Sequence, residues 1–148
     1  MFQREILGLE EARTAVDAVL AEAAKVPNRP LAVAVVDPNG DLIHCARMDG
    51  CYSHIVHMAI QKAYTAARMI RDTKVLNERQ RERGWGTYDW ADSGFSAIEG
   101  GCCFVKPGPE FIPPGKMTGK VVGAIGVSGA DATEDERLAQ VGVKAVKF

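Results

Sequence analysis

Apolar positions recur along the chain with different spacings, and these spacings predict the order of its elements. From Leu7 to Ala24 they return every three or four residues among Glu, Arg and Asp, which indicates an amphipathic helix. A second stretch with helical spacing, rich in alanine, extends from Ser53 to Arg71. Between them lie two apolar runs, Leu31–Val36 and Asp41–Met48, joined by a turn at Asp37-Pro38-Asn39-Gly40. We expect these runs to form a β-hairpin.

The second half of the chain is less regular. Residues Asp72–Arg83 are mostly charged, which predicts a short surface helix or a loop. Gly100–Val105 and Met117–Val127 are apolar and predict two further strands. The segment between them, Lys106–Gly115, is rich in proline and predicts a loop.

Strands grouped as a hairpin and a later pair, with helices before, between and after them, are typical of an α+β domain with an antiparallel sheet. We expect the helices to pack mainly on one face of the sheet and to leave the other face for a partner subunit, so that the protein forms a homo-oligomer. With 148 residues, 47% hydrophobic and 25% charged, the chain suits a single domain over residues 1–148.

Charge and composition limit the classes of partner that we expect for this chain. A net charge of −1 without a basic block argues against a nucleic-acid partner. No apolar stretch is long enough to span a bilayer, and the first residues lack the apolar core of a signal peptide, so we expect a cytoplasmic protein with no membrane partner. The four cysteines have no zinc-site spacing and form no C-x-x-C, which indicates free thiols.

A glycine-rich turn is the first candidate binding site. Gly126, Val127, Ser128 and Gly129 end the last strand, and we expect positive φ angles at the two glycines. Thr133 and Glu136 have the spacing of a capping box and predict a helix start nearby, where free N–H groups favour a carboxylate or phosphate. The alternative is a tight strand-to-helix turn that binds nothing. The spacing fits neither a dinucleotide fingerprint nor a P-loop.

An aromatic segment is the second candidate. Trp85, Tyr88 and Trp90 lie among glycines, which favours a ligand-contacting lid or pocket wall. A plug over the hydrophobic core is the alternative interpretation.

Three isolated side chains are candidates for binding a metal or a ligand. His54 and His57 are three residues apart on a helix and share one face, so either of them could ligate haem iron, although a solvated pair is the commoner arrangement. Arg47 is a candidate for ligand binding, with a structural salt bridge as the alternative.

Three further side chains could act as acids or bases. Lys62 interrupts an apolar helix stripe, and the pKa of a buried Lys or Cys shifts readily. If Lys62, Cys102 and Cys103 line one pocket, they could support isomerase-like catalysis.

Six short motifs occur in this order along the chain: Val36–Gly40, Arg47–Gly50, Lys62–Ala66, Gly100-Gly101, Gly123–Gly129 and Glu134–Glu136. Together they resemble the GlcG/HbpS-like family. The resemblance implies a profilin-like α+β fold with a five-stranded antiparallel sheet, assembly into homo-oligomers, and binding of haem or a related tetrapyrrole by some members. A proline that usually follows the family's Gly-Gly pair is replaced here by Cys102-Cys103.

Two functions follow from these observations. The first is a cytoplasmic protein that binds haem or another flat, anionic small molecule at the Gly126–Gly129 turn. The second is a small cofactor-independent enzyme of a catabolic pathway that acts on a carboxylated small molecule beneath the aromatic segment.

Overall fold

The computed structural model describes residue 1, residues 3–112 and residues 117–148. Its described strands form one antiparallel sheet in the order β2-β1-β4-β3. The strands are β1 (Ala32–Val36), β2 (Leu42–Arg47), β3 (Gly101–Ile112) and β4 (Met117–Ser128). The predicted β-hairpin is confirmed as β1 and β2. The predicted α+β class with an antiparallel sheet is also confirmed, although the described part of the chain contains four strands in this sheet instead of five.

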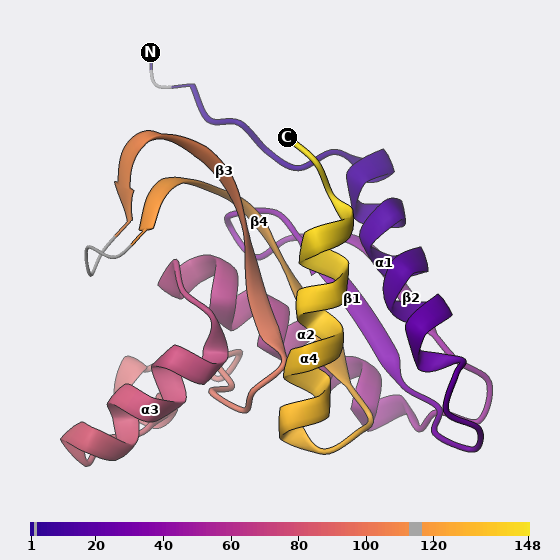
Figure 1. Cartoon of the computed structure of the whole chain (residues 1–148). Coiled ribbons are helices and arrows are strands. Elements are labelled where there is room, and N and C mark those ends of the chain that lie inside the picture. Colours follow the sequence, from indigo (N-terminus) through magenta and orange to yellow (C-terminus); the bar gives the residue numbers. More distant parts are fainter. Residues whose placement is uncertain (2, 113–116) are drawn as a thin grey trace.

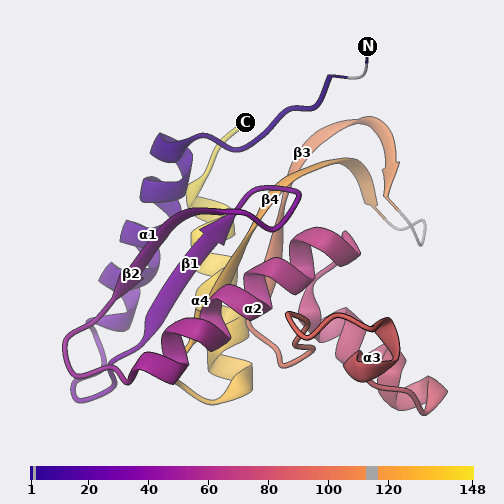
Figure 2. The same cartoon turned by 180° about the vertical axis from the view of Figure 1, so that it is seen from behind.

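Helices cover both faces of the sheet. Helices α1 (Leu9–Ala23) and α4 (Ala132–Ala145) lie side by side on one face, and α2 (Ser53–Met69) crosses the other (Figures 1 and 2). The prediction that the helices pack mainly on one face is therefore wrong. The physical reason lies in β1, whose five residues are all buried, so both faces of this central strand need an apolar cover.

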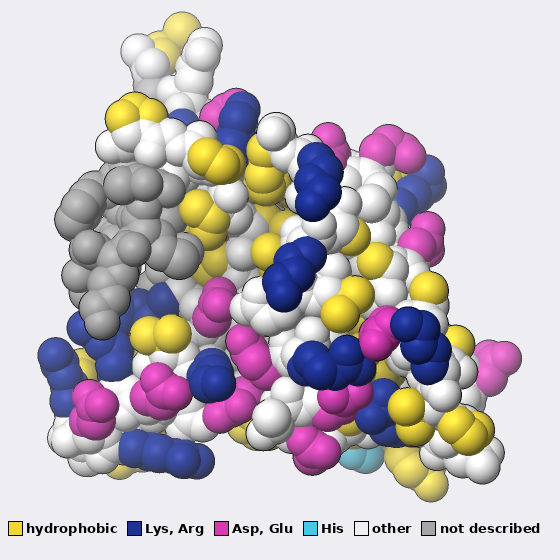
Figure 3. All heavy atoms as spheres, in the orientation of Figure 1, with side chains coloured by type: hydrophobic (Ala, Val, Ile, Leu, Met, Phe, Trp, Pro, Cys, Tyr) yellow, Lys and Arg dark blue, Asp and Glu magenta, His cyan; other side chains and the backbone are white. Residues whose placement is uncertain are grey.

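The core is divided by the sheet, because successive strand residues point to opposite faces. Val33, Val35 and Ile125 pack with the residues of α1 and α4. Val36 and Ala124 pack with alanines of α2 on the other face. On the α1–α4 face the surface carries basic and acidic side chains interspersed, without a block of one sign (Figure 3).

Small residues bring α2 very close to the sheet. A Cβ atom added to Gly126 would lie 2.0 Å from the Ala59 carbonyl oxygen, and one added to Gly101 would lie 2.3 Å from the Lys62 oxygen. Gly126 therefore has a packing role within β4, and the positive φ angle expected there does not occur. At Gly129 the expectation is confirmed, with φ of +134°.

Two element boundaries differ from the sequence prediction. The expected loop Lys106–Gly115 is strand as far as Ile112, and the rest of that loop lies outside the described residues. β3 is an edge strand and its pairing with β4 is irregular between Lys106 and Phe111, which is where prolines without an N–H group can be accommodated. The N-cap of α4 is Asp131 instead of Thr133, because the Asp131 carboxylate accepts a hydrogen bond from Glu134 N.

Candidate functional site: a cavity between arginines and tryptophans

The charged segment after α2 forms a helix that extends away from the sheet. This helix, α3 (Thr73–Arg83), follows a sharp change of direction at Ile70, which has left-handed backbone angles (Figure 2). Its first turn is attached to β3, since Gly101 N donates to the Thr73 hydroxyl at 2.9 Å. The aromatic segment then folds back along α3 and contains the short 3-10 helix η1 (Thr87–Trp90).

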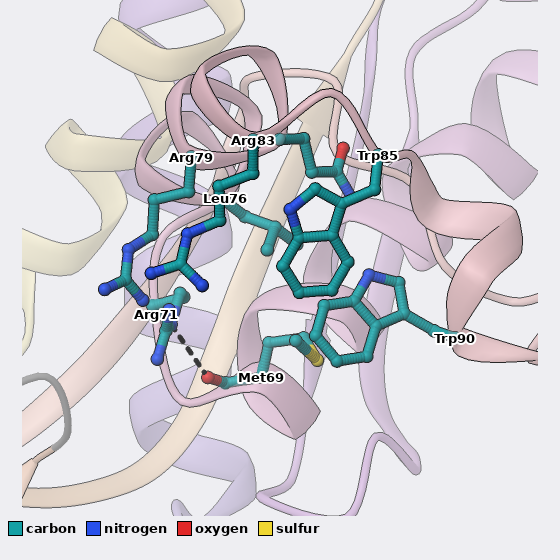
Figure 4. A pocket seen from close by; sticks show the side chains of 8 residues that line it. Met69, Arg71, Leu76, Arg79, Arg83, Trp85 and Trp90 are labelled. Atoms are coloured by element: carbon teal, nitrogen blue, oxygen red, sulfur yellow. Dashed lines mark hydrogen bonds between the residues drawn. The ribbon is translucent and has the colours of Figure 1, made fainter.

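A cavity of about 210 Å³ lies between α3, the end of α2 and the aromatic segment. The two indole rings on one side of it are stacked, with centroids 5.1 Å apart, and the arginines lie on the opposite side (Figure 4). Trp85 and Trp90 thus meet in one wall of this cavity. The lining residues are Met69, Arg71, Leu76, Arg79, Gln80, Arg83, Trp85 and Trp90.

The cavity has an excess of positive charge. None of its three arginines forms an ion pair with a described residue. Arg71 donates to the Met69 carbonyl oxygen at 3.3 Å, and the Arg83 guanidinium lies 5.8 Å from the Trp85 ring centroid. Burial lowers the pKa of Arg71, and the nearby charges of Arg79 and Arg83 lower it further. A bound anion would relieve this repulsion.

Two hydrogen-bond donors in the cavity lining are unused. Gln80 Nε2 and Trp90 Nε1 are buried and have no hydrogen-bond partner among the residues that the structure describes. Buried donors normally have partners, because an unsatisfied one costs about 1–3 kcal/mol. Together with the arginines, these groups are suited to an acceptor-rich anion that lies against an aromatic surface.

A second, more open hollow adjoins the cavity. It has a volume of about 360 Å³ and shares Gln80 and Trp85 with the first. Tyr88, which was predicted to contact a ligand, is 80% exposed and lines this hollow. Trp85 therefore separates two spaces that one extended ligand could occupy together.

The glycine-rich turn is closed by the protein's own side chains. Lys62 crosses beneath it and donates to Val127 O at 2.9 Å and to Asp135 Oδ2 at 2.7 Å. Asp135 Oδ1 accepts from Ala130 N at 2.9 Å, so an internal carboxylate lies where an external anion was expected. Ser128 is buried as well. This geometry favours the tight structural turn of the two alternatives.

The predicted catalytic trio does not share a pocket. Cys102 lies on the α4 side of β3, where its thiol is 3.4 Å from Glu136 Oε1, whereas the Cys103 thiol donates to Ala66 O in α2. Burial raises the pKa of both thiols, which disfavours the reactive thiolate. The free-thiol interpretation of all four cysteines is confirmed.

The remaining predicted residues lie elsewhere. His54 and His57 are both exposed near the start of α2, and the His54 ring stacks on Tyr52. His57 precedes Met69 by twelve residues, or about 18 Å along the helix. Arg47 is exposed at the end of the edge strand β2. A metal-binding role for the histidines stays a prediction, as does a ligand-binding role for Arg47.

The sequence analysis missed the cationic wall of the cavity. Leu76, Gln80 and Arg83 are spaced by four and three residues along α3, and Arg79 adjoins them, so they share one helix face. The sequence did contain a signal for this wall, because that helix face has no acidic residue and the helix is followed by two tryptophans.

Comparison with known proteins identifies the family to which this chain belongs. Residues 7–144 match the family model for haem-degrading, HbpS-like proteins. The chain belongs to the HbpS-like family. GlcG from Escherichia coli strain K12 is 29% identical over 119 residues, which cover 80% of this chain and 79% of GlcG.

Two solved structures are similar over nearly the whole HbpS-like chain. A crystal structure of a double mutant of HbpS from Streptomyces reticuli has a TM-score of 0.81 with 28% identity, covering 100% of this chain and 92% of that one. The structure of a PduOC–haem complex has a TM-score of 0.76 with 21% identity and covers 96% of each chain. The second similarity concerns the fold alone. Within the described residues, no helix of the HbpS-like chain is both long and apolar enough to cross a membrane.

Proposed function

We propose that this protein binds a flat, anionic small molecule of the haem class in the cavity between α3 and the aromatic segment. The observation that carries the proposal is the convergence of Arg71, Arg79 and Arg83, without ion-pair partners among the described residues, on the stacked indoles of Trp85 and Trp90. Membership of a family described as haem-degrading supports the same ligand class.

The size of the site favours a ligand that spans both hollows. The arginine-lined cavity, at about 210 Å³, is smaller than the roughly 300–1,000 Å³ typical of ligand pockets, whereas the adjoining hollow adds about 360 Å³. In our proposal a carboxylate of the ligand enters the cavity and pairs with Arg79 and Arg83. The flat body of the ligand then lies over Trp85 towards Tyr88.

A haemin titration followed by tryptophan fluorescence tests the site directly, because both tryptophans of the chain line the cavity. We expect the double variant Arg79→Gln, Arg83→Gln to bind haemin at least tenfold more weakly, since each charge-assisted hydrogen bond contributes about 1.5–3 kcal/mol. The control is Arg13→Gln, which removes an exposed arginine of α1 and leaves affinity unchanged.

The same titration distinguishes the histidine hypothesis. The double variant His54→Ala, His57→Ala should retain wild-type affinity and spectrum if the ligand occupies the cavity. Loss of a sharp Soret band in this variant, with unchanged binding by the arginine variant, would place the site at the start of α2 and refute our proposal.

The isomerase hypothesis has no comparable observation in its favour. Its lysine is occupied by Asp135 and Val127, and its thiols lie on opposite faces of β3. We therefore propose binding, and not acid–base catalysis, as the function of this chain.

We further propose that the protein acts in the cytoplasm as a homo-oligomer. The edge strand β2 offers unpaired backbone groups, and Leu42 in β2 and Tyr52 at the start of α2 are 52% and 74% exposed. Sedimentation at micromolar concentration should reveal a species larger than the 16.0 kDa chain. A profile with the monomer alone would contradict this proposal.

A further inference from the structure

A second cluster of polar side chains lies where the start of α3 meets β3 and α4. Asp72 immediately before α3, Cys102 in β3 and Glu136 in α4 place one ligand atom each within 4.8 Å of one another. Cys102 is fully buried, and its Sγ lies 3.4 Å from Glu136 Oε1. Three elements that are distant in sequence thus bring two carboxylates and a thiol to one point.

The backbone orients both carboxylates towards that point. Cys103 N donates to Asp72 Oδ1 at 2.8 Å, and Gly100 N donates to Glu136 Oε2 at 3.1 Å. The other oxygen of each carboxylate, Asp72 Oδ2 and Glu136 Oε1, is left to face the thiol and Gln140. Carboxylates that ligate a metal are usually held by such outer hydrogen bonds.

Side-chain hydrogen bonds link the three ligand atoms, because the Cys102 thiol donates to Glu136 Oε1 and the Gln140 amide lies within reach of all three. Gln140 Nε2 lies 3.2 Å from Asp72 Oδ2, 3.3 Å from Cys102 Sγ and 3.3 Å from Glu136 Oε1. With the thiol donating to Glu136 Oε1, the two amide hydrogens can serve Asp72 Oδ2 and Cys102 Sγ. The cluster therefore has enough donors, but its two carboxylates meet without a cationic group among the described residues.

The two carboxylates of this cluster differ from Asp135, which is buried and ion-paired. Asp135 is neutralised by Lys62 at 2.7 Å, whereas neither Asp72 nor Glu136 forms an ion pair with any residue that the structure describes. Both carboxylates are half-buried, and a cation held between them would neutralise their charge.

We propose that Asp72, Cys102 and Glu136 bind a divalent transition-metal ion of the Zn²⁺ type. A thiolate with two carboxylates excludes the hard ions Mg²⁺ and Ca²⁺, which take oxygen ligands alone. Turning the Gln140 amide by 180° would bring its oxygen to the same point as a fourth donor atom. Binding forms a metal–sulfur bond and releases the thiol proton of Cys102 to solvent. The ion joins α3 to β3 and α4.

Titration with Co²⁺ tests this site, because Co²⁺ bound to a thiolate gives an intense charge-transfer absorption. We expect the reduced wild-type protein to develop this band with saturation at one equivalent. Cys102→Ser should abolish the band, whereas the matched control Cys103→Ser should retain it, since the Cys103 thiol points to the opposite face of β3.

Two carboxylate variants keep the test decisive if Cys102→Ser fails to fold. Asp72→Asn and Glu136→Gln preserve side-chain volume and should each weaken Co²⁺ binding more than tenfold, with circular dichroism unchanged. A wild-type protein without the thiolate band would overturn the proposal. So would a band that is lost in Cys103→Ser but retained in Cys102→Ser.

Discussion

Replacing Lys62 with methionine is expected to lower the free energy of unfolding by about 3–5 kcal/mol, because it leaves a buried carboxylate without its cation. The side chains of Lys62 and Asp135 are 1% and 3% exposed. The substitution also removes the donor to Val127 O at the end of β4. A loss of this size is a large part of the roughly 5–15 kcal/mol that stabilises a typical domain. Urea unfolding followed by circular dichroism measures it.

An exposed pair provides the control for this measurement. Lys25 contacts Glu22 on the surface with 71% of its side chain exposed, and Lys25→Met should change stability by less than about 1 kcal/mol. A double variant, Lys62→Met with Asp135→Asn, removes the uncompensated charge and should recover part of the loss. If Lys62→Met is as stable as Lys25→Met, the pair does not hold the turn together.

The buried pair also explains which part of the glycine-rich turn was predictable. The sequence indicates a strand, a turn and a helix there, and the structure contains all three. The partner of the turn comes from a different helix: Lys62 precedes Asp135 by 73 residues. No local pattern reveals such a contact, so an anion site and a self-satisfied turn have the same appearance in the sequence.

The sequence did contain a signal for the covered second face of the sheet, although our prediction placed the helices mainly on one face. Residues 31–36 are apolar without alternation, and a continuous apolar strand is typical of a sheet buried on both faces. The alanine stripe of α2 pointed the same way, because small side chains permit close packing on a strand. The β-hairpin and the helices were recognised from local periodicity, whereas the number of strands came from a resemblance.

Of the candidate site, the sequence analysis identified the tryptophans but not the arginines. Trp85 and Trp90 stand out because large aromatic residues among glycines are unusual in a surface segment. Arg79 and Arg83 do not stand out, since a charged helix is normally solvated. They become a site only when the chain reverses after Gly84 and places the indoles against α3.

Replacing Gly126 with alanine is expected to lower the free energy of unfolding by about 3 kcal/mol, at the upper end of overpacking effects. The new Cβ would lie 2.0 Å from Ala59 O and 2.7 Å from Ala63 N, which are backbone atoms of α2 and cannot turn away. The whole helix must shift instead. Urea unfolding provides the measurement, with Gly108→Ala as the matched control, because a Cβ there has no atom within 4 Å.

The shift of α2 has a second consequence that makes this prediction specific. Lys62 lies between Ala59 and Ala63 on the same helix, so moving α2 also disturbs its bonds to Val127 and Asp135. The loss of unfolding free energy in the double variant Gly126→Ala, Lys62→Met should therefore be smaller than the sum of the losses in the two single variants. Equal stability of the Gly126 and Gly108 variants would contradict the close approach of α2 to β4. If the two losses are strictly additive, Gly126 stabilises the protein independently of the Lys62–Asp135 pair.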